Sequence, residues 1–234
     1  MNEPVTKLDG LLFDKDGTLF DFHATWSVWA AELIVTLSEG DPALAEALAR
    51  GLEFDLETGQ FRPGSPAIAS PNRVVAECVA GALGRSDVDK VEDLLDFHAR
   101  QAPLSPAVPL VPLLEGLRDQ GLVLGVMTND SEATAHAHLR SAGVDRLFDF
   151  VAGYDSGFGA KPDPGPLLAF AEAHGLVPAR VAMVGDSTHD LLAGRAAGMQ
   201  TLAVLTGAAG AAELSPFADH VLTDIGEIPA WLAA

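Results

Sequence analysis

The sequence contains a single cysteine, Cys78, among its 234 residues. One thiol cannot form a disulfide within the chain or supply a pair of metal ligands, which excludes disulfide-stabilised folds and fits a reducing compartment. No apolar run approaches the roughly 18–20 residues of a transmembrane helix. The first residues also lack the basic and then apolar pattern of a secretion signal. We therefore expect a cytoplasmic protein without a membrane partner.

Basic residues are scarce as well. Lysine and arginine together number 14, against 33 aspartates and glutamates, which gives a formal net charge of -19 at pH 7. Such a surface repels nucleic acids and anionic membranes, so neither is expected as a partner. If the chain binds an anionic ligand, a divalent cation, a lysine or backbone N–H groups must supply positive charge locally.

Hydrophobic residues are plentiful by comparison, at 48% of the chain, which is typical of a globular protein. Five short apolar runs without alternation predict parallel strands that are buried on both faces. They lie at residues 8–13, 122–127, 150–154, 181–184 and 201–205, and a sixth run at 220–222 is typical of an edge strand. Strands alternate with helical patterns from Val108 onward, so we predict a doubly wound, mostly parallel α/β sheet of the Rossmann-like type.

Several helix boundaries are indicated by single residues. Ser131 has the side chain of an N-cap, and Asp163 followed by Pro164 predicts an N-cap with proline at the first helical position. Gly143 stands where the helix that begins after Ser131 should end, and Gly175 where the helix that begins at Pro164 should end. Gly198 stands at the expected end of a later helix.

About ninety residues between the first strand and a helix near residue 109 lack a strong strand signal. Helical patterns run through residues 25–38, 43–50, 72–83 and 88–100, and a turn-rich loop at 57–66 divides them. A crossover connection normally needs only about a dozen residues. We therefore predict an α-helical cap domain, residues 21–105, inserted into a core formed by residues 1–20 and 106–234.

Polar residues follow the ends of successive predicted strands. In an open α/β sheet, ligands bind beyond the carboxyl ends of the strands. The candidates there are Asp14, Asp16, Thr128, Asn129, Lys161, Asp186 and Asp190. Each has an ordinary structural explanation when taken alone, such as a helix cap or a solvated turn. Their placement at successive strand ends predicts one site that combines carboxylates, a hydroxyl and a lysine.

In this arrangement the chain resembles the haloacid dehalogenase superfamily of phosphohydrolases, and within it the phosphoglycolate phosphatase-like branch. The sequence Asp-Lys-Asp-Gly-Thr at residues 14–18 matches the first motif of that superfamily, Asp-x-Asp-x-Thr. Thr128 matches the second motif, Lys161 the third, and Gly185-Asp186 with Asp190 the fourth. The helical insertion directly after the first motif matches the position of the cap.

The resemblance implies a magnesium-dependent phosphatase that hydrolyses the phosphate monoester of a small metabolite, with phosphoglycolate as a candidate. Asp14 would attack phosphorus and form an aspartyl-phosphate, and Asp16 would protonate the leaving oxygen and then activate water. The remaining roles also follow from the family pattern. Mg²⁺ would be held by Asp14, the backbone carbonyl of Asp16 and Asp186; the phosphate by Thr128, Asn129 and Lys161; and Asp190 would act in support.

The cap is expected to select the substrate, because the core motifs address only the phosphoryl group. Arg62 is the candidate partner for a substrate carboxylate; Ser65, in the same loop, and His23, at the hinge into the cap, are further candidates. Trp26 and Trp29 follow a helical stripe and are predicted to belong to the interior of the cap.

Alternatives remain open from the sequence. A sugar phosphomutase of the β-phosphoglucomutase type shares the Asp14 and Asp16 pair. Dehalogenase chemistry does not need Asp16 as an acid, and a phosphonatase needs a cap lysine, for which residues 21–105 offer only Lys90. A non-catalytic phosphoester-binding protein would be expected to lack one of the acidic positions, and all of them are present. A monomer and a homodimer are equally compatible with the sequence.

Overall fold

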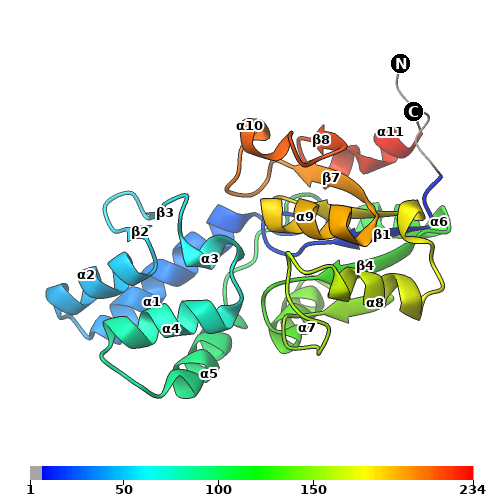
Figure 1. The fold of residues 1–234 in the computed structure, drawn as a ribbon. Coiled ribbons are helices and arrows are strands. Elements are labelled where there is room, and N and C mark those ends of the chain that lie inside the picture. The colour runs from blue at the N-terminus through cyan, green and yellow to red at the C-terminus, as the bar shows by residue number, and fades with distance from the viewer. Residues whose placement is uncertain (1–6, 234) are drawn as a thin grey trace.

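A computed structural model describes residues 7–233 and contains a six-stranded, all-parallel sheet (Figure 1). The strands occur in the order β5-β4-β1-β6-β7-β8, so β1 lies at the centre and β8 at an edge. Their bounds are β1 Gly10–Phe13, β4 Val123–Met127, β5 Phe150–Ala152, β6 Val181–Gly185, β7 Gln200–Val204 and β8 His220–Leu222. The predicted doubly wound α/β class is confirmed, and all six apolar runs form strands.

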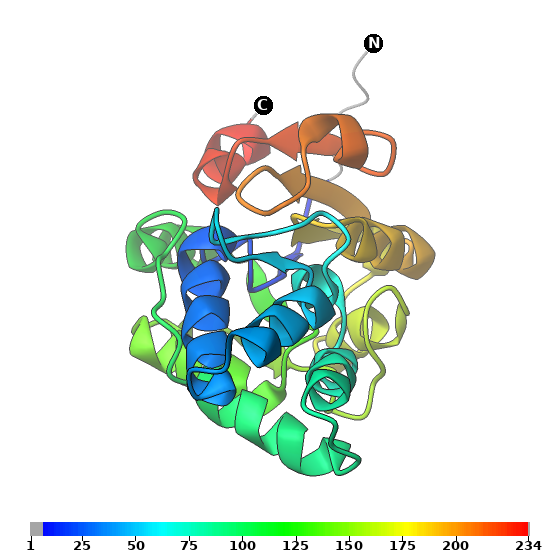
Figure 2. The ribbon, with the colours of Figure 1, turned by 90° about the vertical axis from the view of Figure 1, so that its left-hand side faces the viewer.

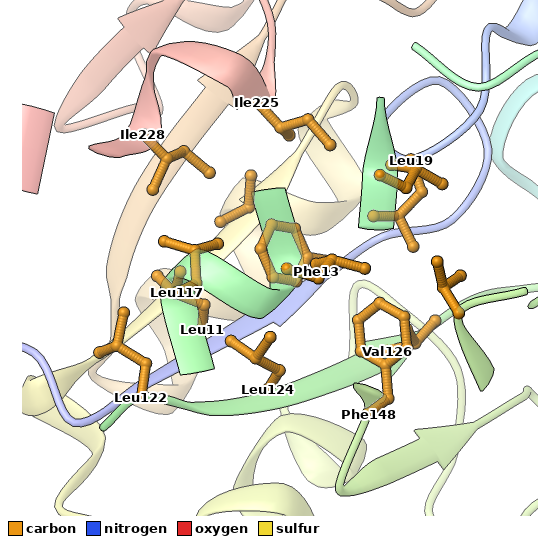
Figure 3. Packing of buried hydrophobic residues seen from close by; sticks show 14 of the residues in the cluster. Leu11, Phe13, Leu19, Leu117, Leu122, Leu124, Val126, Phe148, Ile225 and Ile228 are labelled. Carbon is orange, nitrogen blue, oxygen red and sulfur yellow. The ribbon is translucent and has the colours of Figure 1, made fainter. Parts of the chain in front are cut away.

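Helices cover both faces of the sheet because successive strand residues point to opposite sides. Leu11 and Phe13 of β1 pack in one buried cluster with α6, α7 and the C-terminal helix, whereas Leu12 packs in another with α8 and α9. Figure 3 shows part of the first cluster, with Phe13 close to Leu117 and Ile225. The bounds are α6 Leu110–Asp119, α7 Glu132–Ser141, α8 Gly165–Ala173, α9 Thr188–Ala197, α10 Ala211–Leu214 and α11 Ile228–Leu232, with short 3₁₀ turns η2 Asp145–Leu147, η3 Pro178–Arg180 and η4 Ile225–Glu227.

The helix-boundary predictions hold with one shift. The Ser131 hydroxyl accepts a hydrogen bond from the Thr134 amide at 3.3 Å. Gly143, Gly175 and Gly198 all have positive φ where their helices end. The helix predicted to begin at Pro164 begins one residue later, with Pro164 itself at the N-cap position. Asp163 still accepts a hydrogen bond from the Gly165 amide, at 2.7 Å, so it closes the turn that precedes the helix.

Between β1 and α6 the chain forms a second, mostly helical body, called the helical segment below (Figure 2). It contains η1 His23–Ser27, a π-helical turn, followed by α1 Val28–Ser38, α2 Pro42–Gly51, β2 Phe54–Asp55, β3 Gln60–Phe61, α3 Pro66–Ala69, α4 Asn72–Ala82 and α5 Val88–Ala99. Its buried apolar side chains form their own cluster, from Phe22 to Leu95. Among the described residues, none of the buried residues in the clusters around the sheet comes from residues 22–95.

The loop predicted at residues 57–66 is only partly a loop, which corrects the sequence interpretation. It contains β3, which pairs with β2 in a small antiparallel hairpin, and the start of α3. The rings of Phe54 and Phe61 lie 5.1 Å apart on this hairpin and are buried. Strands of two residues are too short to show an alternating pattern, so no sequence pattern predicted them.

Two adjacent connections join the helical segment to the sheet, one leaving the core and one returning to it. The Asp21 amide donates to the Ser105 carbonyl at 2.8 Å, and the Ala107 amide donates to the Leu19 carbonyl at 3.0 Å. The outgoing and returning connections are therefore hydrogen-bonded to each other. None of the helices within residues 7–233 has the length and apolar character needed to cross a membrane.

Candidate active site

A cavity of about 80 Å³ lies between the carboxyl ends of the central strands and the helical segment. Its sheet side is formed by residues that follow β1, β4, β5 and β6, and its other side by residues of η1, α1, α3, α4 and the end of α5, with Ser70 between α3 and α4. The predicted residues Asp14, Asp16, Thr128, Asn129, Lys161 and Asp186 all line it. The structure therefore brings together the strand-end residues that the sequence placed at one edge.

Lys161 joins two carboxylates at the bottom of this cavity. Its Nζ atom lies 2.5 Å from Asp14 Oδ1 and 2.6 Å from Asp190 Oδ1, and all three side chains are buried. Burial raises the pKa of Asp14 to about 7, although the Lys161 charge opposes that shift. Burial alone would lower the pKa of Lys161, but the carboxylates of Asp14 and Asp190 raise it above its usual value. Lys161 is therefore a permanent ammonium group next to Asp14.

Asp190 is fixed by the start of α9. Its Oδ2 atom accepts hydrogen bonds from the Ser187 amide at 3.0 Å and from the Ser187 hydroxyl at 2.7 Å, forming a capping box. Its other oxygen is bound by Lys161. The sequence analysis gave Asp190 a supporting role, and its direct contact with Lys161 is compatible with that role.

Asp186 lies in a tight backbone cradle. A side chain at Gly17 or Gly207 would overlap its carboxylate, and Thr18 donates a hydrogen bond to Asp186 Oδ1 at 3.4 Å. Burial, and then the charges of Asp14 and Asp190, raise the pKa of Asp186 well above its usual range. Both glycines therefore allow the backbone to approach a carboxylate that is costly to keep ionised without a nearby cation.

The carboxylates of Asp14, Asp186 and Asp190 form an oxygen-rich cluster. One oxygen from each lies within 4.8 Å of the others. Hard carboxylate oxygens are the ligands that Mg²⁺ prefers, and few of them are needed because water and substrate complete its octahedron. The donor set therefore fits a divalent cation. The sequence expectation named the carboxylates of Asp14 and Asp186, which belong to the cluster. It also named the backbone carbonyl of Asp16, which this set of carboxylate oxygens does not test.

Asp16 lies in the cavity wall and has one carboxylate oxygen without a hydrogen-bond partner among the described residues. Gly17 follows it with φ of +85°, and the Gly17 amide donates to the Phe20 carbonyl at 2.7 Å, so the chain turns sharply after the strand. Asp16 Oδ2 lies 2.6 Å from Lys15 Nζ, whereas Asp16 Oδ1 is buried without a hydrogen-bond partner among the described residues. An unpaired carboxylate oxygen in a cavity wall is well placed to exchange a proton with a ligand.

Lys15 was not identified by sequence reasoning, although it is the residue between the two motif aspartates. Its side chain is completely buried. Besides Asp16, its Nζ atom contacts Asp130 Oδ2 at 3.3 Å and His138 Nδ1 at 3.0 Å, and it lies 5.4 Å from the centre of the Trp26 ring. A lysine two residues after a buried strand was the available signal, but two of its partners, Asp130 and His138, are more than a hundred residues away in the sequence.

His138 connects this lysine to the helical segment. Its Nε2 atom lies 2.7 Å from the Ala99 carbonyl at the end of α5, which assigns the ring proton to Nε2 and leaves Nδ1 to accept from Lys15. Burial, and then the Lys15 charge, lower the pKa of His138 to about 4. Burial also raises the pKa of Asp130 to about 6, with Lys15 opposing that shift. His138 is therefore neutral at physiological pH.

Thr128 and Asn129 contribute differently. The Thr128 hydroxyl accepts a hydrogen bond from the Asp130 amide at 3.1 Å and lies in the cavity wall. The Asn129 side chain donates to the Lys161 carbonyl at 2.8 Å and accepts from the Lys161 amide at 2.9 Å. These two bonds give the Asn129 side chain a role in placing Lys161, which the expectation of phosphate binding did not include.

The three residues suggested for substrate selection do not line the cavity. Arg62 is two-thirds exposed on a separate surface hollow, 3.7 Å from Asp55. Ser65 is buried and donates to the Leu52 carbonyl at 2.6 Å while its hydroxyl caps α3. His23 packs against the Phe22 ring, with 5.6 Å between ring centres. The β2–β3 hairpin, which the sequence did not reveal, carries Arg62 away from the site.

Other residues of the helical segment face the site instead, namely Trp26, Trp29, Ala67, Ile68, Ser70, Asn72, Val75 and Ala99. Trp26 and Trp29 also pack in the apolar cluster of the segment, as predicted. The helical spacing of Trp26 and Trp29 in the sequence predicted that they pack in that cluster. It could not predict that both residues also border the cavity at the ends of the strands.

Comparisons with known proteins agree with this geometry. A family model described as haloacid dehalogenase-like hydrolase matches residues 8–198. A phosphoglycolate phosphatase from Xanthomonas campestris pv. campestris is 33% identical over 202 residues, covering 84% of this chain and 83% of that protein. The pyrophosphatase PpaX of Halalkalibacterium halodurans is 26% identical over 204 residues, covering 85% of this chain and 84% of the relative. The crystal structure of an HAD phosphatase from Thermococcus onnurineus superposes with a TM-score of 0.68 at 22% identity, covering 96% of this chain and 98% of that one.

The chain belongs to the haloacid dehalogenase-like hydrolase family. Within that family its relatives by sequence are phosphatases, so the enzyme class is that of a phosphatase. The resemblance inferred from the four motifs is thereby confirmed.

Proposed function

We propose that this protein is a Mg²⁺-dependent phosphatase that hydrolyses a small phosphate monoester through an aspartyl-phosphate on Asp14. The observation that carries the proposal is the contact of Lys161 with both Asp14 and Asp190, beside the carboxylate of Asp186. This supports the proposal because a carboxylate that can act as a nucleophile, a fixed positive charge and oxygens that can bind a metal lie close together.

In the proposed first step, an Asp14 oxygen attacks phosphorus while the bond from phosphorus to the leaving oxygen breaks. Asp16 Oδ1, which has no other partner among the described residues, gives its proton to the leaving alcohol. In the second step water attacks phosphorus, Asp16 takes a proton from that water, and Asp14 departs as a carboxylate with release of phosphate. Two displacements thus replace one difficult displacement.

The other residues would hold charge in place during these steps. Lys161 balances the Asp14 carboxylate and the transferring phosphoryl group, and Thr128 with nearby backbone amides contacts phosphate oxygens. Asp14, the Asp16 carbonyl and Asp186 would hold Mg²⁺, which when bound screens the charge of the phosphate oxygens. Asp190 stays engaged with Lys161 and Ser187 and keeps the lysine in position.

We further propose that residues 21–105 act as a cap. The support is that the helical segment has its own apolar cluster, which is the property of a separately packed body, and that it forms one wall of the cavity. Closure of such a body over the strand ends would exclude water from the first displacement.

The test is release of inorganic phosphate by the purified chain, with and without MgCl₂. Substrates would include phosphoglycolate, because a relative is a phosphoglycolate phosphatase. Hexose phosphates, nucleotides, pyrophosphate and p-nitrophenyl phosphate would be tested beside it. Asp14→Asn is the catalytic variant, and Asp89→Asn, at a carboxylate that is 88% exposed on α5, is the matched control. Failure of every substrate would refute the proposal. Hexose phosphate isomerisation that requires a bisphosphate activator would indicate a phosphomutase instead.

A further inference from the structure

The two walls of the cavity differ sharply in chemistry. The sheet side presents the carboxylates of Asp14, Asp16, Asp130 and Asp186. The side formed by the helical segment presents mainly carbon: the indole rings of Trp26 and Trp29 and the aliphatic side chains of Ile68 and Val75. Because the phosphoryl group must lie against Asp14, the alcohol part of the ester has to lie against this apolar wall.

Positive charge is confined to the bottom of the cavity. Lys161 is the only lysine or arginine that lines it within residues 7–233, and its ammonium is already shared between Asp14 and Asp190. The ammonium of Lys15 lies behind the wall, held by Asp16 and Asp130. A second anionic group on the substrate would therefore enter a space that already contains several carboxylates, without a cation left to pair with it.

The neighbouring opening has the same character. A second hollow of about 350 Å³ shares Ile68, Ser70, Asp186, Ser187 and His189 with the cavity. Among the described residues that line it, the carboxyl groups are those of Asp186 and Glu213, and no lysine or arginine accompanies them. A ligand that passes from this hollow into the cavity meets no lysine or arginine before Lys161.

The indole N–H of Trp29 favours a ligand that carries a hydrogen-bond acceptor. Its side chain is 6% exposed, and its Nε1 atom is buried without a hydrogen-bond partner among the described residues. A buried N–H without a partner costs free energy, and an indole nitrogen can only donate. An oxygen acceptor on a ligand in the cavity would satisfy this group.

Resting on the proposed function, we propose that the leaving group is an uncharged alcohol with an apolar or aromatic body and an oxygen acceptor for Trp29. Esters whose leaving group carries a carboxylate or another phosphate are poor substrates. This inference replaces the expectation of a carboxylate partner at Arg62, because Arg62 lies on a different surface.

A matched pair of esters tests the charge requirement. Phosphoglycolate and its amide, phosphoglycolamide, have the same skeleton and differ by one negative charge. With saturating Mg²⁺, the kcat/KM of the amide should exceed that of phosphoglycolate at least tenfold, and benzyl phosphate should also be the better substrate. Equal or better hydrolysis of phosphoglycolate than of its amide would overturn the inference, even if p-nitrophenyl phosphate is hydrolysed. Failure of these four esters together with the whole substrate panel above would refute the proposed phosphatase function itself.

Trp29→Phe tests the acceptor, since it keeps an aromatic ring and removes the N–H. It should lower kcat/KM for phosphoglycolamide, which has a carbonyl oxygen, about tenfold more than for benzyl phosphate, which has no acceptor beyond the ester. Trp231→Phe is the matched control, because its Nε1 atom is also buried without a described partner but lies in α11, outside the cavity. A uniform loss on both esters in Trp29→Phe would assign Trp29 a packing role and refute the acceptor.

Discussion

Replacing Lys15 by methionine should destabilise the protein strongly. The Lys15 side chain is completely buried and contacts Asp16 at 2.6 Å, Asp130 at 3.3 Å and His138 at 3.0 Å. Methionine fills a similar volume but leaves two largely buried carboxylates, those of Asp16 and Asp130, without their cation. Removing one partner of a buried ion pair typically costs about 3–5 kcal/mol. We expect Lys15→Met to lower the free energy of unfolding by that amount.

Urea unfolding, followed by tryptophan fluorescence and by circular dichroism, measures this loss. Lys90→Met is the matched control, because the Lys90 side chain is 75% exposed and its pairing with Asp87 is screened by water. Lys15→Met combined with Asp130→Asn should recover part of the loss, since one unpaired carboxylate is removed. A loss below about 1 kcal/mol in the single variant would show that the buried pair is not energetically important.

The same substitution should have a distinctive kinetic effect. Lys15 holds Asp16 Oδ2 and so orients Asp16 Oδ1 in the cavity wall. Esters of alkyl alcohols depend on proton donation to the leaving oxygen, whereas p-nitrophenolate departs almost without it. In Lys15→Met, kcat should therefore fall more for benzyl phosphate than for p-nitrophenyl phosphate. An equal fall for both esters would contradict the assignment of Lys15 as the residue that positions Asp16.

Four further outcomes are expected. Asp14→Asn should lower phosphate release by a factor of about 10⁴ or more while circular dichroism stays unchanged, because the nucleophile is lost. EDTA should abolish phosphate release and excess Mg²⁺ should restore it; unchanged activity in EDTA would contradict the cation assigned to the carboxylate cluster. Burial lowers the pKa of His138 from 6.5 to about 4, so between these pH values only the unfolded state takes up the proton. The contribution of His138 to the free energy of unfolding is therefore fully present above about pH 6.5 and is lost as the pH falls towards 4. The difference in urea midpoint between wild type and His138→Gln should therefore shrink between pH 7 and pH 4, a comparison that cancels the opposite contribution of Asp130. Ser70→Lys should raise kcat/KM for phosphoglycolate, since it adds a cation to the cavity wall, and no change would count against the charge argument.

Much of the sheet was predictable because its strands are buried on both faces. The strand at the centre reads as uninterrupted apolar sequence, and the residue that follows such a run must lie at the sheet edge. Asp14, Thr128 and Asp186 were found in this way. Their meeting point follows from parallel topology alone, without knowledge of any side-chain contact.

The remainder of the site depends on contacts that no local pattern records. Lys15 acquires its surroundings from Asp130 and His138, which come from a different strand end and a different helix. Arg62 was assigned to the substrate because an arginine in the predicted cap could pair with a substrate carboxylate, but it follows the paired strands β2 and β3 and lies on a separate surface hollow. Periodicity identifies what a helix buries, but it does not identify which end of a buried cluster remains open to a cavity.

The paired connections between the helical segment and the sheet determine where movement would be smallest. Asp21 bonds to Ser105 and Ala107 to Leu19, only a few residues from Asp16. A rotation about these crossings would have a short lever arm at Asp16 and a longer one at the turn between α1 and α2, at the far end of the helical segment (Figure 1). Asp16, the proposed acid–base residue, would therefore keep its place through an opening and closing cycle, while that far end moves the most. Changes near the α1–α2 turn would then alter how ligands enter and leave and would leave the proton-transfer geometry intact.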